Sequence, residues 1–139
     1  MVREASLKVS ERPHLENQEA VVGLLWEHLK DADREKVVLL LLDAQNRITG
    51  LVDLFAGTVD QCHVYPREIL KAAITANAVG IILAHNHPSG AVRPSREDEA
   101  LTETVEKACR LVGIKLLDHV IVGEEGHFSF RQAGILDRP

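Results

Sequence analysis

Two short, continuous apolar runs place the strongest constraint on the fold of this 139-residue chain. Residues 37–42 read VVLLLL and residues 79–84 read VGIILA. Apolar runs of this length are typical of strands that are buried on both faces. They are far shorter than the roughly 20 apolar residues that a membrane span needs. The sequence therefore predicts a sheet whose central strands are covered by other elements.

The remaining elements are predicted around these two strands. Helices are predicted at residues 18–31, 66–78 and 95–111. Further strands are predicted at residues 47–55, 58–65, 114–123 and 127–131. Residues 1–16 are expected to form an extended or loosely held arm. This order predicts one domain over residues 17–139 of the α/β class, an α+β sandwich in which helices flank a mixed sheet.

Composition and charge exclude several classes of protein. Hydrophobic residues make up 45% of the chain and charged residues 27%, which suits a globular domain. The net charge of -5 gives no electrostatic reason to expect binding to nucleic acid. The first residues lack the apolar segment of a secretory signal, so we expect a cytoplasmic protein. Cys62 and Cys109 form no C-x-x-C pair and are expected to be buried thiols.

The stretch from His85 to Asp98 carries the residues that are best suited to bind a metal or take part in catalysis. Side chains two apart on a strand share a face, so His85 and His87 are predicted to project together from the end of the second apolar strand. The loop that follows is predicted to end at Ser95, and Asp98 comes one helical turn later. Two imidazoles and one carboxylate make the three-ligand set of a catalytic zinc, which leaves a fourth position to water.

Each part of this stretch also has a purely structural interpretation. Ser95 and Asp98 have the spacing of a capping box, in which both side chains hold the start of a helix. Two histidines on one strand face are often ordinary hydrogen-bonded residues. Their joint occurrence favours a metal site, because each buried imidazole needs a partner. Asn86 and Ser89 are expected to hold the loop by hydrogen bonds to the backbone.

The pattern His-x-His, seven residues, Ser, two residues, Asp resembles the JAMM motif of JAB/MPN metalloproteases. The longer segment that contains this pattern is similar to the RadC family in particular. It reads AHNHPS at residues 84–89, followed by Gly90 and then by Pro94 and Ser95. Further similar features are Leu54-Phe55-x-Gly57-Thr58, Tyr65-Pro66-Arg67-Glu68, Leu117-Asp118-His119 and Ser129-Phe130. The resemblance runs from about residue 12 to the C-terminus. Such proteins commonly carry a helix-hairpin-helix region before this domain, so the chain is expected to be a short member or an excised domain.

The resemblance implies a cytidine-deaminase-like JAB/MPN architecture with zinc bound by His85, His87 and Asp98. It also implies that Ser95 lies near the water on the metal and helps to stabilise the tetrahedral intermediate. The implied reaction is hydrolysis of a peptide or isopeptide bond, in which a glutamate carries a proton from the water to the leaving amine. Leu117-Asp118-His119 is predicted on a neighbouring strand. There Asp118 or His119 either supports a ligating histidine or makes a structural hydrogen bond.

The position of the glutamate departs from the family pattern. JAMM proteases carry it on an early strand, whereas the predicted early hairpin contains only Asp43 and Asp53. Asp53 is one candidate for the general base. Glu68 is the other, although a carboxylate at the start of a helix is also favoured by the helix dipole. The choice between the two stays open at this point.

Two classes of function compete on this basis. The first is a zinc-dependent peptidase or isopeptidase with a peptide or protein substrate. The second is a non-catalytic interaction module in which zinc only stabilises the fold. The resemblance to the RadC family implies that such a module is linked to DNA repair or replication through its partners. A zinc nucleobase deaminase would need P-C-x-x-C, and other zinc proteases would need H-E-x-x-H, but the chain contains neither. Exposed strands at the sheet edges also make a homodimer plausible.

Overall fold

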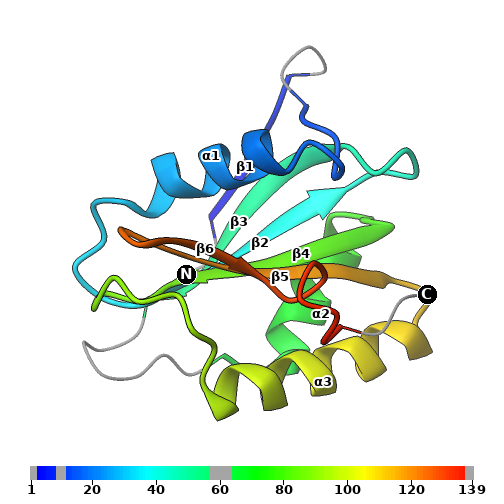
Figure 1. Ribbon diagram of the computed structural model, residues 1–139. Helices are drawn as coiled ribbons and strands as arrows, with labels where there is room; N and C mark the ends of the chain where they lie inside the picture. The colour runs from blue at the N-terminus through cyan, green and yellow to red at the C-terminus, as the bar shows by residue number, and fades with distance from the viewer. Residues whose placement is uncertain (1–2, 9–11, 57–63, 137–139) are drawn as a thin grey trace.

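The computed structural model describes residues 3–8, 12–56 and 64–136. Six strands form one sheet in the order β1-β3-β2-β4-β5-β6 (Figure 1). Their bounds are β1 Arg3–Ser6, β2 Lys36–Leu42, β3 Ile48–Ala56, β4 Gly80–Asn86, β5 Lys115–Gly123 and β6 Gly126–Ser129. Only β4 and β5 run parallel among these neighbours, which makes the sheet mixed.

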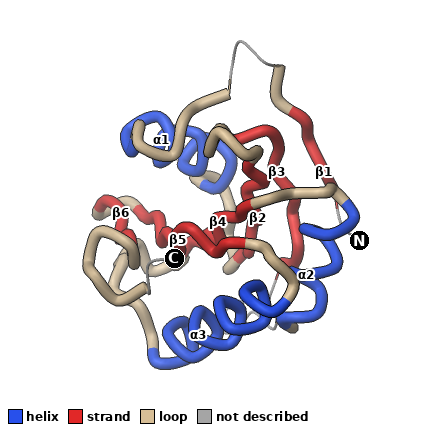
Figure 2. Tube along the Cα trace, turned by 90° about the vertical axis from the view of Figure 1, so that its right-hand side faces the viewer, coloured by secondary structure: helices blue, strands red, loops and turns tan. Residues whose placement is uncertain are grey.

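Three helices cover the sheet, namely α1 Gln18–Leu29, α2 Pro66–Thr75 and α3 Arg96–Leu111. The helix α1 lies on one face, and α2 and α3 lie together on the other (Figures 1 and 2). The predicted α+β sandwich with a mixed sheet is therefore confirmed. Among the described helices, none combines the length and apolar character that a membrane span requires.

The two apolar runs are the central strands β2 and β4. Alternate side chains of β2 face opposite layers: Leu39 and Leu41 pack in the cluster beneath α2 and α3, whereas Leu40 and Leu42 pack in the cluster beneath α1. Every residue of β4 is buried. Full burial of a leucine stabilises the fold by about 1.5–3 kcal/mol. Helices on both faces therefore explain why neither run alternates with polar residues.

Strand pairing brings together segments that are far apart in the sequence. The antiparallel β2 and β4 pair Val37 with His85, so the start of β2 lies beside the end of β4. The parallel β4 and β5 pair Leu83 with His119 and His85 with Ile121. Because Leu83 and His85 are two positions apart, His119 faces the same side of the sheet as His85. This face is the one that α2 and α3 cover.

Some predicted boundaries differ from the structure. The predicted arm contains β1, in which Ser6 pairs with Gly50 at the edge of the sheet. The helix expected to reach residue 78 ends at Thr75, because Asn77 adopts the left-handed conformation with φ 56°. The strand expected at residues 58–65 falls mostly outside the described residues. Val64 and Tyr65, which are described, belong to no strand.

Candidate metal centre

The imidazoles of His85 and His87 lie side by side where β4 ends. Their Nε2 atoms are 3.0 Å apart. His85 is almost fully buried, with 3% of its surface exposed, and His87 is partly buried. The alternation of side chains along the strand therefore places both rings on one face, as the spacing predicts.

Asp98 reaches the two imidazoles from the first turn of α3. Its Oδ1 lies 3.2 Å from His85 Nε2, and its Oδ2 lies 3.2 Å from His87 Nε2. The same residue takes part in a capping box: Ser95 Oγ accepts from the Asp98 N–H at 3.0 Å, and Asp98 Oδ2 accepts from the Ser95 N–H at 2.8 Å. Both interpretations of the Ser95–Asp98 spacing therefore hold at once. The helix cap fixes the carboxylate that faces the histidines.

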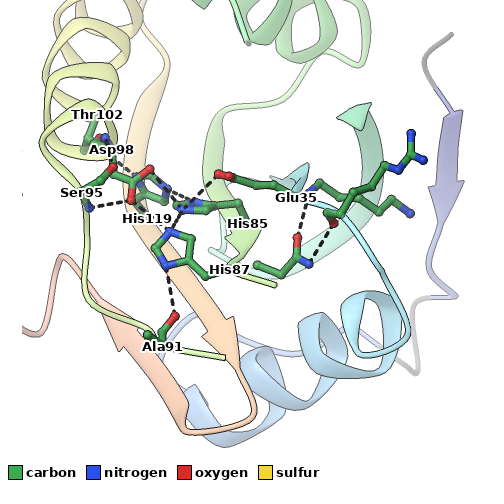
Figure 3. Close-up of polar contacts among 11 residues, drawn as sticks. Glu35, His85, His87, Ala91, Ser95, Asp98, Thr102 and His119 are labelled. Carbon is green, nitrogen blue, oxygen red and sulfur yellow. Dashed lines mark hydrogen bonds and ion pairs between the residues drawn. The ribbon is translucent and has the colours of Figure 1, made fainter. Parts of the chain in front are cut away.

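A fourth side chain, Glu35, completes the cluster. Its Oε1 lies 3.9 Å from His85 Nε2, and the carboxylate points toward that ring in Figure 3. One donor atom from each of Glu35, His85, His87 and Asp98 lies within 4.8 Å of the others. Glu35 immediately precedes β2, and it lies two positions before Val37, which pairs with His85. Side chains two positions apart on a strand point to the same face, so the Glu35 carboxylate lies on the face that carries the imidazoles.

The two carboxylates favoured by the sequence lie elsewhere. Asp53 Oδ1 is 2.6 Å from His28 Nε2 of α1 and 3.9 Å from Lys36 Nζ. Glu68 lies on α2 with 46% of its side chain exposed, and its Oε1 is 3.8 Å from Arg67 Nε. The structure brings neither of them into the group of possible metal ligands. The carboxylate beside the histidines is Glu35, which sequence reasoning missed.

A hydrogen bond to the following loop determines which nitrogen of His87 can bind a metal. Its Nδ1 lies 3.1 Å from the carbonyl oxygen of Ala91 in the loop that follows β4. A carbonyl only accepts, so this bond requires a proton on Nδ1. In the neutral ring, Nε2 then carries a lone pair that is directed into the cluster. A loop carbonyl thereby prepares His87 to bind a metal through Nε2.

A longer chain of contacts decides the tautomer of His85. The Thr102 hydroxyl donates to the carbonyl of Asp98 at 2.7 Å, so it can only accept from Nδ1 of His119. His119 is fully buried, and burial lowers its pKa well below 6.5, which keeps the ring neutral. Its Nε2 therefore accepts from His85 Nδ1 at 2.8 Å. This leaves a lone pair on His85 Nε2, which faces the cluster (Figure 3).

The carboxylates and His87 have shifted pKa values. Burial acts to raise the pKa of Asp98, but its contacts with the imidazoles of His85 and His87 outweigh burial and hold that pKa far below its usual value. The hydrogen bond to Asp98 raises the pKa of His87 above 6.5. Burial raises the pKa of Glu35 above 4.5. The cluster thus pairs an aspartate that is held in its charged form with a glutamate that binds a proton more tightly than an exposed glutamate does.

The donor atoms could hold a divalent metal ion. Imidazole nitrogen and carboxylate oxygen both bind such ions, and here two nitrogens and two carboxylates converge. Without a cation, the lone pairs on the two Nε2 atoms would face each other 3.0 Å apart beside an ionised carboxylate. That arrangement requires a positive charge between the rings. A proton on His87 supplies it in the metal-free protein, in accord with the raised pKa.

Other polar residues singled out by the sequence are placed as follows. His119 supports His85, whereas Asp118 accepts from Ser129 Oγ at 2.7 Å and from the Arg131 N–H at 3.0 Å, and so organises the turn after β6. Ser89 Oγ accepts from the Ala91 N–H at 3.4 Å within the loop, as expected. Of Asp118 and His119, it is therefore His119 that supports the metal-binding histidine His85. Cys109 is buried, and burial raises the pKa of its thiol to about 11, whereas Cys62 lies outside the described residues.

Comparisons with known proteins agree with this geometry. Residues 15–135 match the family model of the RadC-like JAB domain. A UPF0758 protein of Leptothrix cholodnii is 44% identical over 129 residues, which cover 93% of this chain and 58% of that protein. A UPF0758 protein of Actinobacillus pleuropneumoniae is 49% identical over 104 residues, which cover 75% of this chain and 47% of that protein.

A third relative, a UPF0758 protein of Rubrobacter xylanophilus, is 45% identical over 125 residues, which cover 90% of this chain and 55% of the relative. The chain thus spans about half the length of the curated relatives it matches. The family model covers most of the chain, including the segment that carries Glu35 and the segment from His85 to Asp98. By this match, the chain belongs to the RadC-like JAB domain family.

Proposed function

We propose that this chain is a zinc-dependent hydrolase that cleaves a peptide or isopeptide bond in a peptide or protein substrate. The observation that carries the proposal is the position of Glu35 beside His85, His87 and Asp98. A purely structural zinc site is closed by four protein ligands, whereas a catalytic site keeps one position for water. We assign the two histidines and Asp98 as the three ligands. Glu35, whose Oε1 lies at the longer distance of 3.9 Å from His85 Nε2, we assign as the proton carrier.

The chemistry follows from what each group can do. A zinc ion held by His85, His87 and Asp98 would lower the pKa of water to about 7 and polarise a carbonyl group. Glu35 takes the proton that the attacking water gives up and passes it to the leaving amine. Burial raises its pKa, so the carboxyl group can hold that proton between the two transfers.

Ser95 has a separate role in the proposal. Its Oγ already accepts a hydrogen bond from the Asp98 N–H, so the hydroxyl proton is available for another acceptor. Ser95 also lies beside the cluster, since its own N–H donates to Asp98 Oδ2. We assign this hydroxyl to the oxygen of the scissile carbonyl, where negative charge develops as the water attacks.

The alternative of a non-catalytic module depends on the absence of a nearby proton carrier. The 3.9 Å separation of Glu35 Oε1 and His85 Nε2 supports the hydrolase instead. The test is cleavage of a mixed peptide library by zinc-loaded protein, followed by mass spectrometry. We expect cleavage that a chelator abolishes and that Glu35→Gln reduces about 10²–10⁴-fold, the usual contribution of a general base. Glu27→Gln, on the exposed side of α1, is the matched control. Cleavage that survives both the chelator and Glu35→Gln would refute the proposal.

A further inference from the structure

The side chain of Asn86, between the two histidines, makes two hydrogen bonds on either side of Glu35. Its Oδ1 accepts from the Lys36 N–H at 2.7 Å. Its Nδ2 donates to the carbonyl oxygen of Arg34 at 3.2 Å. Asn86 is buried, with 5% of its surface exposed. The carboxamide is therefore hydrogen-bonded to the backbone of the residue directly before Glu35 and of the residue directly after it.

These two hydrogen bonds of Asn86 lie just beyond the point where the backbone pairing of β2 and β4 ends. The last register pair of β2 and β4 at this end is Val37 with His85. One step further along, the side chain of Asn86 replaces the backbone as the partner of residues 34 and 36. The Lys36 N–H can only donate and the Arg34 carbonyl can only accept, so both contacts require the carboxamide in one orientation. Aspartate and leucine, which are similar in size, cannot make both bonds.

We propose that Asn86 is the residue that positions Glu35 at the metal centre. By alternation along β4, His85 and His87 project to the face of the sheet beneath α3, and Asn86 projects to the opposite face. One three-residue segment thereby supplies two metal ligands and also fixes the backbone that carries the proton carrier. This inference rests on the proposed function, because it assigns Asn86 an effect that passes through Glu35.

The experiment is a double-mutant cycle of Asn86→Ala and Glu35→Gln on the full chain, with Co²⁺ as the probe. Cobalt binds such donor sets, and its visible spectrum reports the surroundings of the ion, whereas zinc is silent. The dissociation constant and the spectrum are measured for the wild type, both single variants and the double variant. Asn17→Ala is the control: it removes the N-cap of α1, a bond of 3.2 Å to the Ala20 N–H, without contact to the cluster.

We expect Glu35→Gln to weaken Co²⁺ binding about tenfold, the lower range for a group that supports a metal site. Asn86→Ala should weaken binding to a similar extent and change the spectrum in the same way. In the Glu35→Gln background, Asn86→Ala should add less than about twofold, because its effect passes through the glutamate. Asn17→Ala should leave the constant and the spectrum unchanged.

Three results would overturn the inference, and they differ in what else they remove. If Glu35→Gln changes the binding but Asn86→Ala does not, or if Asn86→Ala has its full effect in both backgrounds, only the positioning role is lost. If Glu35→Gln itself changes neither the constant nor the spectrum, Glu35 does not act at the metal, and both proposals fail. Should Asn86→Ala not fold, Asn86→Asp takes its place. It keeps the acceptor for the Lys36 N–H, loses the donor to Arg34, and is expected to give a smaller effect that again disappears with Glu35→Gln.

Discussion

Nδ1 of His85 lies 2.8 Å from Nε2 of His119, and this contact determines which nitrogen of His85 is free for a metal. His119 is held in turn by Thr102 of α3, the helix that also contributes Asp98. The same helix therefore presents the carboxylate and anchors the histidine pair. His119 also stacks on Phe130, with ring centroids 4.6 Å apart, which restricts the ring further.

The first prediction concerns His119. Replacing it with Phe keeps an aromatic ring against Phe130 but removes the acceptor for His85 Nδ1, so His85 is no longer held in the metal-binding tautomer. Loss of such an outer partner usually weakens metal binding about 10–100-fold, and we expect an effect in that range. Competition with a chelator measures it. His119→Gln offers an acceptor and a donor and should recover part of the affinity; equal affinity of His119→Phe and wild type would contradict the assignment.

The second prediction concerns pH. The hydrogen bond to Asp98 raises the pKa of His87 above 6.5 in the metal-free protein. The folded state then binds this proton more tightly than the unfolded chain. The resulting stabilisation of the metal-free protein is complete below pH 6.5 and is lost as the pH rises through the raised pKa.

A metal must displace the same proton, so metal affinity changes in the opposite direction. We expect it to fall as the pH drops, beginning above pH 6.5 and approaching tenfold per unit below the raised pKa. Titration of the His87 ring protons by NMR in metal-free protein gives the pKa directly. Asp98→Asn should return the pKa toward 6.5. A wild-type pKa at or below 6.5 would show that the Asp98 contact is not formed.

The third prediction concerns Gly123, at the end of β5. A Cβ there would lie 2.4 Å from the carbonyl oxygen of Gly90, so Gly123→Ala must displace the loop that carries the His87 partner Ala91. We expect a loss of about 1–3 kcal/mol in unfolding free energy, together with weaker metal binding. Gly23→Ala on α1, where a Cβ meets no atom within 4 Å, is the control. It should stabilise the protein by about 0.5–1 kcal/mol. Thermal unfolding compares the two, and an unchanged midpoint for Gly123→Ala would show that the loop accommodates the methyl group.

The sequence predicts the fold class well because its strongest signals are local. The apolar runs of β2 and β4 and the start of α1 after Asn17 each follow from neighbouring residues. The spacing of His85 and His87 and the cap formed by Ser95 and Asp98 are also local, so these side chains are found where they are expected.

The position of Glu35 is not predictable in this way, because it depends on sheet register. The apolar run that predicts β2 begins at Val37, so Glu35 lies outside the strands that the sequence predicts. Only the pairing of Val37 with His85 shows that Glu35 lies at the histidines. The sequence favours Asp53 because it lies on an early strand, but its contact with His28 arises from the packing of α1 on the sheet. Neither packing nor register is encoded in a short motif.

The most direct test of the account is the metal content of the purified protein. After loading with zinc and removal of excess metal, wild type, His85→Ala, His87→Ala and His127→Ala are analysed for zinc per chain. His127 is exposed on β6 and serves as the control. The account predicts one zinc per chain for wild type and His127→Ala and none for the other two variants. Equal zinc content in all four proteins would contradict it.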